Sequence, residues 1–340
     1  MSDITPPIGP KILNGERFEI DLEGPEHVRK KLLALERTED CRFSPDGRRL
    51  AIAGFARNSI AIFDVEITAS EGTQKIVLSD YIELKSAELE YPHGVDFVDN
   101  STLVVANRER LVSVFNLPTG QSGQEFQADP LVRVTRADRF NKLSSPGSVS
   151  VTQLSSDSYE VMVCNNYTHR VTRHTISRST PQKVTQNRIA LDKGLNVPDG
   201  IAISNDRDVI AVSNHFKHEV YLYPNDGKNR RATLPTGVLK GLDFPHGLRF
   251  FGQDKYIFVA DAGLPFARVY KSEDGKWRGD HAPVMTIRMM DDELFLKGHY
   301  YHQEGGLKGL DFSPCQRILA TTCEMQPLAF YDATRMFAHI

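Results

Sequence analysis

The sequence lacks several features that mark common classes of protein. It has no long apolar run and no basic tract, and its 41 lysines and arginines are nearly balanced by 44 aspartates and glutamates. Such a chain offers no segment that would span a membrane, and a net charge of −3 gives no field that would attract nucleic acid. We therefore expect neither a membrane nor a nucleic acid as partner.

Cysteine is also scarce, and its pattern argues against disulfides and against a cysteine-based metal site. The cysteines lie mostly within apolar runs, and no two of them have the spacing of metal ligands. They are Cys41, Cys164, Cys315 and Cys323. Buried, reduced thiols are the expected state. The first ten residues show no charged start followed by an apolar segment, so we expect no signal peptide and a cytoplasmic protein.

What the sequence does contain is a pattern that returns six times. Each copy has a short apolar strand that opens at a Gly-like turn, then polar turn residues, then a second apolar strand that ends in a small and a polar residue. A third alternating run follows, as in 59–64 and 219–223. The copies begin at residues 40, 94, 147, 200, 247 and 309, so their spacing ranges from 47 to 62. This period, with several short strands per unit, predicts an all-β, six-bladed β-propeller with four-stranded antiparallel blades.

One closed ring accommodates the whole chain, so we predict a single domain over 1–340. Its blades are expected to begin near residues 39, 93, 146, 199, 246 and 308. Few residues follow the last predicted strand, so the N-terminal segment 1–37 must help to close the ring. Within it, residues 17–22 are expected to pair beside the last strand. Residues 25–36, with a proline near their start and leucines inside, are expected to form one short helix.

The propeller geometry gathers residues from all six copies at one mouth of the channel. The first strand of each blade lines the channel, and the second runs antiparallel to it. The start of the first strand and the end of the second therefore meet on the same face. The residues just before the six starting points are Glu39, His93, Pro146, Asp199, His246 and Lys308. With six blades, Glu39 opposes Asp199 and His93 opposes His246.

Two imidazoles and two carboxylates that face one axis predict a divalent-metal site. Its expected ligands are Glu39, His93, Asp199 and His246. This mixture suits Zn²⁺, Mn²⁺, Fe²⁺ or Ni²⁺ better than Ca²⁺, which remains an option. Fewer than six protein ligands leave positions for water and substrate. The structural alternative is that each His caps a backbone group in a Pro-His-Gly turn, while the acids cap turns or pair with Lys308.

The residues that follow the second strands form a second set at the same mouth. Those expected to bind substrate are Asn107, Asn165, Tyr167, Asn214, Phe216 and Asp261. Arg108 is the candidate to hold a carboxylate or phosphate, with a solvated surface position as its alternative, and His215 or Lys308 is the candidate to move a proton. For Asn and Asp the alternative is structural, because both tolerate tight turns. An insertion at 291–306 is expected to cover the pocket as a lid with Tyr300 towards the ligand, or else to be a solvated loop.

With these residues, the sequence resembles the six-bladed propeller clan of the senescence-marker-protein/gluconolactonase family, the strictosidine-synthase-like proteins, the paraoxonases and the NHL-repeat proteins. The repeat carries this resemblance over nearly the whole chain. The Pro-Asp-Gly segment at Asp199 is similar to that of the gluconolactonase family, whose Asp is a metal ligand, and Glu39 resembles that family's first Glu ligand by position. The family's Pro-Asn-Gly segment is replaced by Ser-Pro-Gly at Pro146, which argues against calcium and plain gluconolactonase activity. The Pro-His-Gly turns at His93 and His246 resemble those of the propeller lyases, streptogramin lyase and peptidylglycine amidoglycolate lyase, which use a metal with His ligands.

The leading hypothesis is a metal-dependent enzyme that acts on a small polar organic molecule. The reaction would be lactone or ester hydrolysis, or a lyase or cyclisation step, in which the ion polarises a carbonyl or lowers the pKa of bound water. A non-enzymatic propeller that binds a protein or small-molecule partner on its face is the alternative, and it predicts no ion. A third interpretation is a metal-free, strictosidine-synthase-like catalyst with Glu39 or Asp199 as general base. The oligomeric state does not follow from the sequence.

Overall fold

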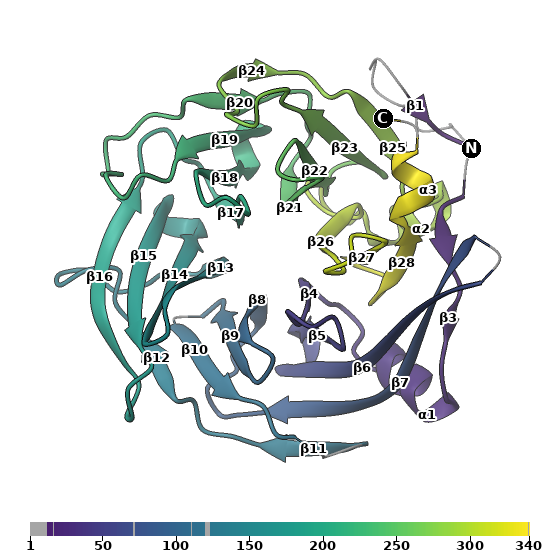
Figure 1. Cartoon of the computed structure of the whole chain (residues 1–340), viewed down its shortest axis with the longest axis horizontal. Coiled ribbons are helices and arrows are strands. Elements are labelled where there is room, and N and C mark those ends of the chain that lie inside the picture. The colour runs from purple at the N-terminus through teal and green to yellow at the C-terminus, as the bar shows by residue number, and fades with distance from the viewer. Residues whose placement is uncertain (1–11, 16, 71, 110, 120–122, 339) are drawn as a thin grey trace.

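Six antiparallel sheets stand in a ring around one axis, in the order in which they occur along the chain (Figure 1). The computed structural model describes residues 12–15, 17–70, 72–109, 111–119, 123–338 and 340. The six-bladed β-propeller predicted from the repeat is confirmed. Residues 1–11, on which the expectation about a signal peptide depends, lie outside the described residues.

Each blade has four antiparallel strands that run outward from the axis. The innermost strands are β4 (Cys41–Phe43), β8 (Pro92–Asp99), β13 (Pro146–Ser155), β17 (Pro198–Ile203), β21 (Pro245–Phe251) and β26 (Leu307–Phe312). The second strands are β5 (Arg49–Gly54), β9 (Thr102–Asn107), β14 (Ser158–Asn165), β18 (Val209–Asn214), β22 (Tyr256–Asp261) and β27 (Ile318–Cys323). The third strands are β6 (Ser59–Ser70), β10 (Leu111–Asn116), β15 (Arg170–Ser177), β19 (Glu219–Pro224), β23 (Phe266–Lys271) and β28 (Ala329–Asp332). The outermost strands are β7 (Thr73–Lys85), β12 (Val132–Val134), β16 (Lys183–Leu191), β20 (Gly237–Leu239), β25 (Met285–Arg288) and β2 (Glu19–Ile20).

The N-terminal segment closes the ring as expected. Strand β2 pairs antiparallel with β28, with Glu19 opposite Tyr331, so the first and last parts of the chain share one blade. The predicted short helix is α1 (Glu26–Leu33), which buries Val28 and Leu32 against the first blade. Two further helices, α2 (Asp292–Gly298) and α3 (Ala333–Phe337), lie near the C-terminus.

Short parallel strands cover several outer edges of the blades. Strands β3 (Leu22–Glu23) and β11 (Gln124–Gln127) both pair with β7, β24 (Gly279–His281) pairs with β20, and β1 (Ile12–Leu13) pairs with β25. An uncovered edge exposes unpaired backbone groups that can recruit another strand. These additions therefore protect the rim of the ring, and two of them tie a blade to segments that follow later in the chain.

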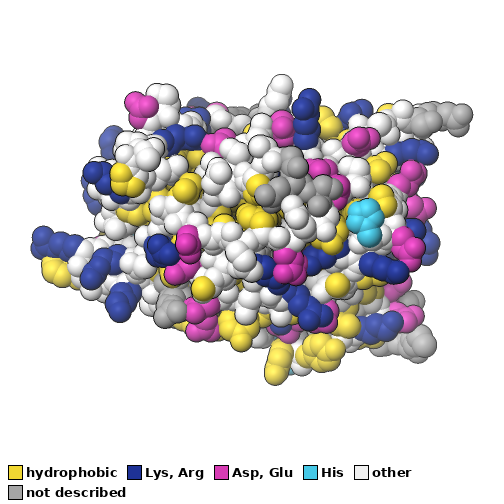
Figure 2. All heavy atoms as spheres, turned by 90° about the horizontal axis from the view of Figure 1, so that it is seen from below, with side chains coloured by type: hydrophobic (Ala, Val, Ile, Leu, Met, Phe, Trp, Pro, Cys, Tyr) yellow, Lys and Arg dark blue, Asp and Glu magenta, His cyan; other side chains and the backbone are white. Residues whose placement is uncertain are grey.

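The hydrophobic core of the described chain consists of six clusters, one between each pair of neighbouring blades. Alternation along a strand supplies both interfaces of its blade. In β5, Leu50 and Ile52 pack towards the last blade, whereas Ala51 and Ala53 pack towards the second. The outer wall seen in Figure 2 mixes positive and negative side chains. None of the helices in the described ranges is both long and apolar enough to cross a membrane.

A β-bulge begins the innermost strand of the last three blades. The strand register shifts between residues 198 and 201, 245 and 248, and 307 and 310. A bulge re-aims the side chains around it, and here it places Asp199, His246 and Lys308 at the axis. Each is followed by a glycine because the next inner strand passes very close: a Cβ on Gly200 would lie 2.0 Å from the carbonyl oxygen of His246. The Gly-like start of the repeat is thus a packing requirement at the axis.

Three neighbouring pairs of blades are joined by the same contact at this mouth. The short 3₁₀ turns η1 (Phe55–Arg57), η2 (Asn166–Thr168) and η3 (His215–Lys217) each end at a residue with left-handed backbone, whose side chain accepts a backbone N–H from the next blade. The pairs are Tyr91 N to Asn58 Oδ1 (2.7 Å), Val197 N to His169 Nδ1 (2.9 Å) and Phe244 N to His218 Nδ1 (3.3 Å). Each donor itself has a positive φ and precedes a proline. These contacts hold in place the strained backbone that leads into the site.

Candidate functional site

A cavity of about 330 Å³ opens where the inner strands begin, and residues of all six copies of the repeat surround it. Nine of the residues predicted from the sequence line it. They are Glu39, His93, Arg108, Tyr167, Asp199, His215, Phe216, His246 and Lys308. The convergence of distant positions on one mouth therefore follows the expected geometry of the repeat.

Three of the four predicted ligands form a compact group. Potential ligand atoms of Glu39, His93 and His246 all lie within 4.8 Å of one another, and all three residues are buried. Glu39 Oε2 is 3.5 Å from His93 Nε2 and 3.9 Å from His246 Nε2. Ligands of a tetrahedral ion bound at 2.0–2.1 Å are about 3.3 Å apart. The three side chains are therefore close to the arrangement that such an ion requires.

The carboxylate oxygen at the centre of this group tests whether the residues fit a metal. Glu39 Oε2 is buried and accepts no hydrogen bond from any described residue. A buried carboxylate oxygen without a donor is costly unless a cation binds it. Two imidazole nitrogens and this oxygen form the donor set of many zinc and related sites. The residues present therefore fit a divalent ion.

The other oxygen of Glu39 is held by two cations. Arg37 Nε donates to Glu39 Oε1 at 2.5 Å, and Lys308 Nζ donates to the same oxygen at 3.1 Å. Both cations also pair with Glu324, at 2.8 Å from Arg37 and 2.7 Å from Lys308. Burial by itself raises the pKa of Glu39, but Lys308, followed by His93 and Arg37, outweighs it and holds that pKa well below its usual range. Glu39 is thus a fixed, ionised carboxylate.

The fourth predicted ligand, Asp199, lies beside the group of three. Its Oδ2 is 3.0 Å from His246 Nε2, and its Oδ1 accepts a hydrogen bond from Asn166 Nδ2 at 2.9 Å. Burial raises the pKa of Asp199, but His246, followed by His93 and Arg108, brings it well below its usual range. Asp199 is therefore an ionised carboxylate that contacts His246, one of the group of three, and is held by Asn166.

His215 and Lys308, the two candidates for proton transfer, differ in their surroundings. The ammonium of Lys308 is engaged by the carboxylates of Glu39 and Glu324. His215 Nδ1 lies 3.1 Å from the carbonyl oxygen of Pro245, which assigns the hydrogen to Nδ1 and leaves Nε2 basic. Burial lowers the pKa of His215 to about 4, so the ring is neutral at pH 7. Lys308 is thus held between two carboxylates, whereas His215 is a neutral ring whose Nε2 carries no hydrogen.

The structure corrects the prediction for the residues that end the second strands. Asn107, Asn165, Asn214 and Asp261 are fully buried and do not line the cavity. In each, a side-chain oxygen accepts a backbone N–H from the loop that leads into the same blade. The donors are Glu90, Ser144, Asn196 and Asp243. These side chains brace the loop, so the structural alternative holds for all four.

The insertion at 291–306 also differs in part from expectation. It forms α2 and a loop, and Gln303 and Glu304 of this loop line the cavity. Tyr300 and Tyr301 are each 67% exposed and do not line it. The backbone N–H of Tyr300 donates to the carbonyl of Gly298, the last residue of α2, at 2.9 Å. The insertion therefore borders the pocket through a later segment than the sequence indicated.

Six residues that line the cavity were not among the predicted site residues. They are Arg37, Phe55, Asn166, Val197, Gln303 and Glu304. For two of them the repeat held a signal, because Phe55 and Asn166 directly follow second strands, as Arg108 and His215 do. Arg37 and Glu304 belong to segments outside the repeat. Their side chains meet at 3.5 Å, which ties the insertion to the first blade.

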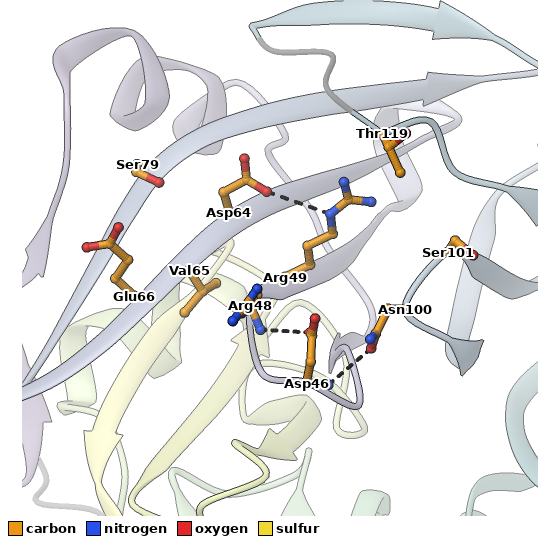
Figure 3. Close-up of a pocket in the computed structure, with 10 residues that line it drawn as sticks. All are labelled: Asp46, Arg48, Arg49, Asp64, Val65, Glu66, Ser79, Asn100, Ser101 and Thr119. Atoms are coloured by element: carbon orange, nitrogen blue, oxygen red, sulfur yellow. Dashed lines mark hydrogen bonds and ion pairs between the residues drawn. The ribbon is translucent and has the colours of Figure 1, made fainter.

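A second, larger cavity of about 520 Å³ lies elsewhere, against the first two blades. Figure 3 shows Arg49 and Asp64 facing each other in this cavity, with Arg49 Nε 3.7 Å from Asp64 Oδ1. Asp46 and Asn100 are likewise tied together through a backbone hydrogen bond of 3.1 Å. Its charged side chains are all at least partly exposed. Buried charged groups converge instead in the smaller cavity.

Fold and cavity together define a six-bladed β-propeller with a buried cluster of histidines and acids at one mouth of its channel. Among solved structures, the chain is similar to an X-ray structure described as a putative gluconolactonase, with a TM-score of 0.53 and 13% sequence identity. The similarity covers 87% of this chain and 89% of that one. At this identity the likeness shows the shared fold. No protein-family model matches the sequence, and no curated protein matches it.

Proposed function

We propose that the protein is a metal-dependent enzyme that acts on a small polar organic molecule at this mouth. The reaction is lactone or ester hydrolysis, or a lyase or cyclisation step. One observation carries the proposal: the buried Glu39 Oε2 has no hydrogen-bond donor among the described residues and lies between two imidazole nitrogens. The similarity in fold to a structure described as a putative gluconolactonase supports the hydrolytic option.

The ion would be held by Glu39, His93 and His246, with Asp199 beside it. Two nitrogens and one oxygen favour zinc, manganese, iron or nickel over calcium. When bound, such an ion supplies Lewis acidity for a carbonyl group or lowers the pKa of a water molecule. Arg37 and Lys308 fix the Glu39 carboxylate from its other side, so that Oε2 stays turned towards the imidazoles.

The remaining groups handle the proton and the substrate. His215 takes up a proton at Nε2, since its Nδ1 faces the carbonyl of Pro245. Tyr167 and Phe216 form part of the wall against which an organic body would pack. A cavity of about 330 Å³ is of the size that takes small organic ligands. The cytoplasmic location expected from the sequence stays a prediction.

Metal analysis tests this proposal directly. Purified protein should contain close to one divalent ion per chain by plasma mass spectrometry. The double variant His93→Ala/His246→Ala should contain none. A matched control is His27→Ala/His302→Ala, which removes two exposed histidines and should keep the ion.

Activity completes the test. A panel of lactones and esters, followed by acid release, should show turnover that a chelator abolishes and that added Zn²⁺ or Mn²⁺ restores. Full activity in a metal-free preparation would overturn the proposal. A protein without ion and without turnover of any substrate would instead support the non-enzymatic alternative.

A further inference from the structure

Arg108 is half-buried, and its surroundings differ from those of the buried arginines of the described chain. Its Nη1 atom is buried and makes no hydrogen bond, and no acidic group of the described residues lies within 4.0 Å of its guanidinium. By contrast, Arg42 pairs with Asp96 at 3.1 Å and Arg268 pairs with Asp261 at 3.3 Å. A buried guanidinium nitrogen without a hydrogen-bond acceptor is unfavourable unless a ligand supplies one.

The charges around the cavity leave Arg108 as the cation that lacks a counter-charge. Arg37 and Lys308 are both engaged with Glu39. Asp199, the acid whose pKa Arg108 helps to lower, is occupied by His246 and Asn166. The positive charge of Arg108 is therefore available to an anion that enters the cavity.

One aromatic ring lies beside this cation, and two others line the same cavity. The guanidinium carbon of Arg108 lies 5.9 Å from the ring centroid of Tyr167, within the range of a cation–π contact. Phe55 and Phe216 line the same cavity. Tyr167 and Phe216 are largely exposed at the rim, being 71% and 44% accessible. Such a wall packs against a flat apolar body better than against a bare inorganic ion.

We infer that the substrate carries a carboxylate on an aromatic or other flat apolar body, and that Arg108 binds this carboxylate. A single guanidinium matches the one charge of a carboxylate, which it can bind through two parallel hydrogen bonds. A phosphate dianion would call for a second free cation. This inference rests on the proposed function, because it takes the reacting group to lie at the Glu39–His93–His246 end of the same cavity.

Binding of simple probes tests the inference without requiring turnover. Isothermal titration should show that benzoate and phenylacetate bind the wild-type protein, whereas the neutral analogue benzamide binds at least about ten-fold more weakly. Arg108→Gln should weaken benzoate by about ten-fold or more, and Arg108→Lys should recover only part of the loss, because an ammonium cannot form the paired contact. The matched control is Arg139→Gln, an exposed arginine whose guanidinium carbon lies 4.3 Å from the centroid of Phe140 and which should leave binding unchanged.

The same variants separate this inference from the metal proposal. Benzoate affinity that is identical in wild type and Arg108→Gln, with the ion still present, would overturn the inference and leave the metal site standing. Benzoate binding that depends on Arg108, in a protein that never binds metal, would support the inference and contradict the proposed metal-dependent function. Inorganic phosphate that binds more tightly than benzoate would overturn the assignment to a carboxylate. Unfolding midpoints of both Arg108 variants close to that of wild type establish that lost binding is not lost folding.

Discussion

The imidazole rings of His93 and His246 stack, with centroids 5.5 Å apart and planes 23° from parallel. Two cationic rings at this separation would repel each other, whereas a metal ligand must be neutral at its donor nitrogen. Burial, followed by the charge of Arg108, lowers the pKa of His93 to about 3, so this ring is neutral at pH 7. His93 can therefore donate a nitrogen lone pair without prior deprotonation.

Replacement of Glu39 by glutamine should remove the ion while keeping the shape of the side chain. The amide lacks the negative charge that completes the group of three, and Arg37 and Lys308 retain Glu324 as partner. We expect metal affinity to fall at least about 100-fold. Titration with Zn²⁺ in the presence of a competing chelator measures the change. Unaltered affinity would show that Glu39 is not a ligand.

Replacement of two adjacent asparagines by alanine should have different effects, one on stability and the other on metal affinity. Asn165 bonds to the backbone of Ser144 and to Thr172 Oγ1 at 3.1 Å, so Asn165→Ala should lower the free energy of unfolding by about 1–3 kcal/mol and leave metal affinity intact. Asn166→Ala removes the hydrogen-bond donor to Asp199 and should lower metal affinity by about ten-fold or more. Urea unfolding and metal titration of both variants provide the comparison. The reverse pattern would place Asn165 in the site.

Because the inner strands pack closely at the axis, one glycine should not tolerate substitution by alanine. A Cβ on Gly200 would meet the carbonyl oxygen of His246 at 2.0 Å, so Gly200→Ala must push two inner strands apart. We expect a loss of about 1–3 kcal/mol or more in stability, together with loss of the ion. Gly15→Ala is the control, because nothing lies within 4 Å of a Cβ at that position. Thermal unfolding that does not distinguish the two variants would contradict this account of the repeat.

A buried histidine remote from the cavity should account for part of the stability that the protein loses in acid. His174 is buried in β15 between Asn187 and Thr172, and burial lowers the pKa of His174 to about 4. The unfolded chain binds this proton near pH 6.5, so the folded state binds fewer protons between the two values. The stability that neutral His174 contributes is therefore fully present above pH 6.5 and is lost as the pH falls through about 4.

The variant His174→Gln removes this titration. It should be less stable than wild type at pH 7, because the buried contacts are disturbed, but its stability should decline less between pH 6.5 and 4. Denaturant midpoints across this range measure both slopes, with His27→Gln as an exposed control. Parallel slopes for wild type and His174→Gln would exclude His174 as a source of acid sensitivity.

The repeat allowed the fold and the centre of the site to be predicted, because equivalent positions in a propeller must converge. Glu39, His93 and His246 were found in this way. The same reasoning misplaced the asparagines, since Asn165 ends β14 and bonds within its blade, whereas Asn166 begins η2 and bonds to Asp199. Arg37 and Glu304 could not be found, because their segments follow no repeat and their positions depend on tertiary contacts alone.

The contact between β2 and β28 has a consequence for how the protein becomes competent. Glu39 comes from the first blade and Lys308 from the last, so these partners meet only across the seam that the N-terminal strand fastens. A chain under synthesis would have most of its blades before Lys308 was available to pair with the carboxylate of Glu39. The pocket is therefore complete only when the ring has closed through β2 and β28. The same closure brings Lys308 to the carboxylate of Glu39.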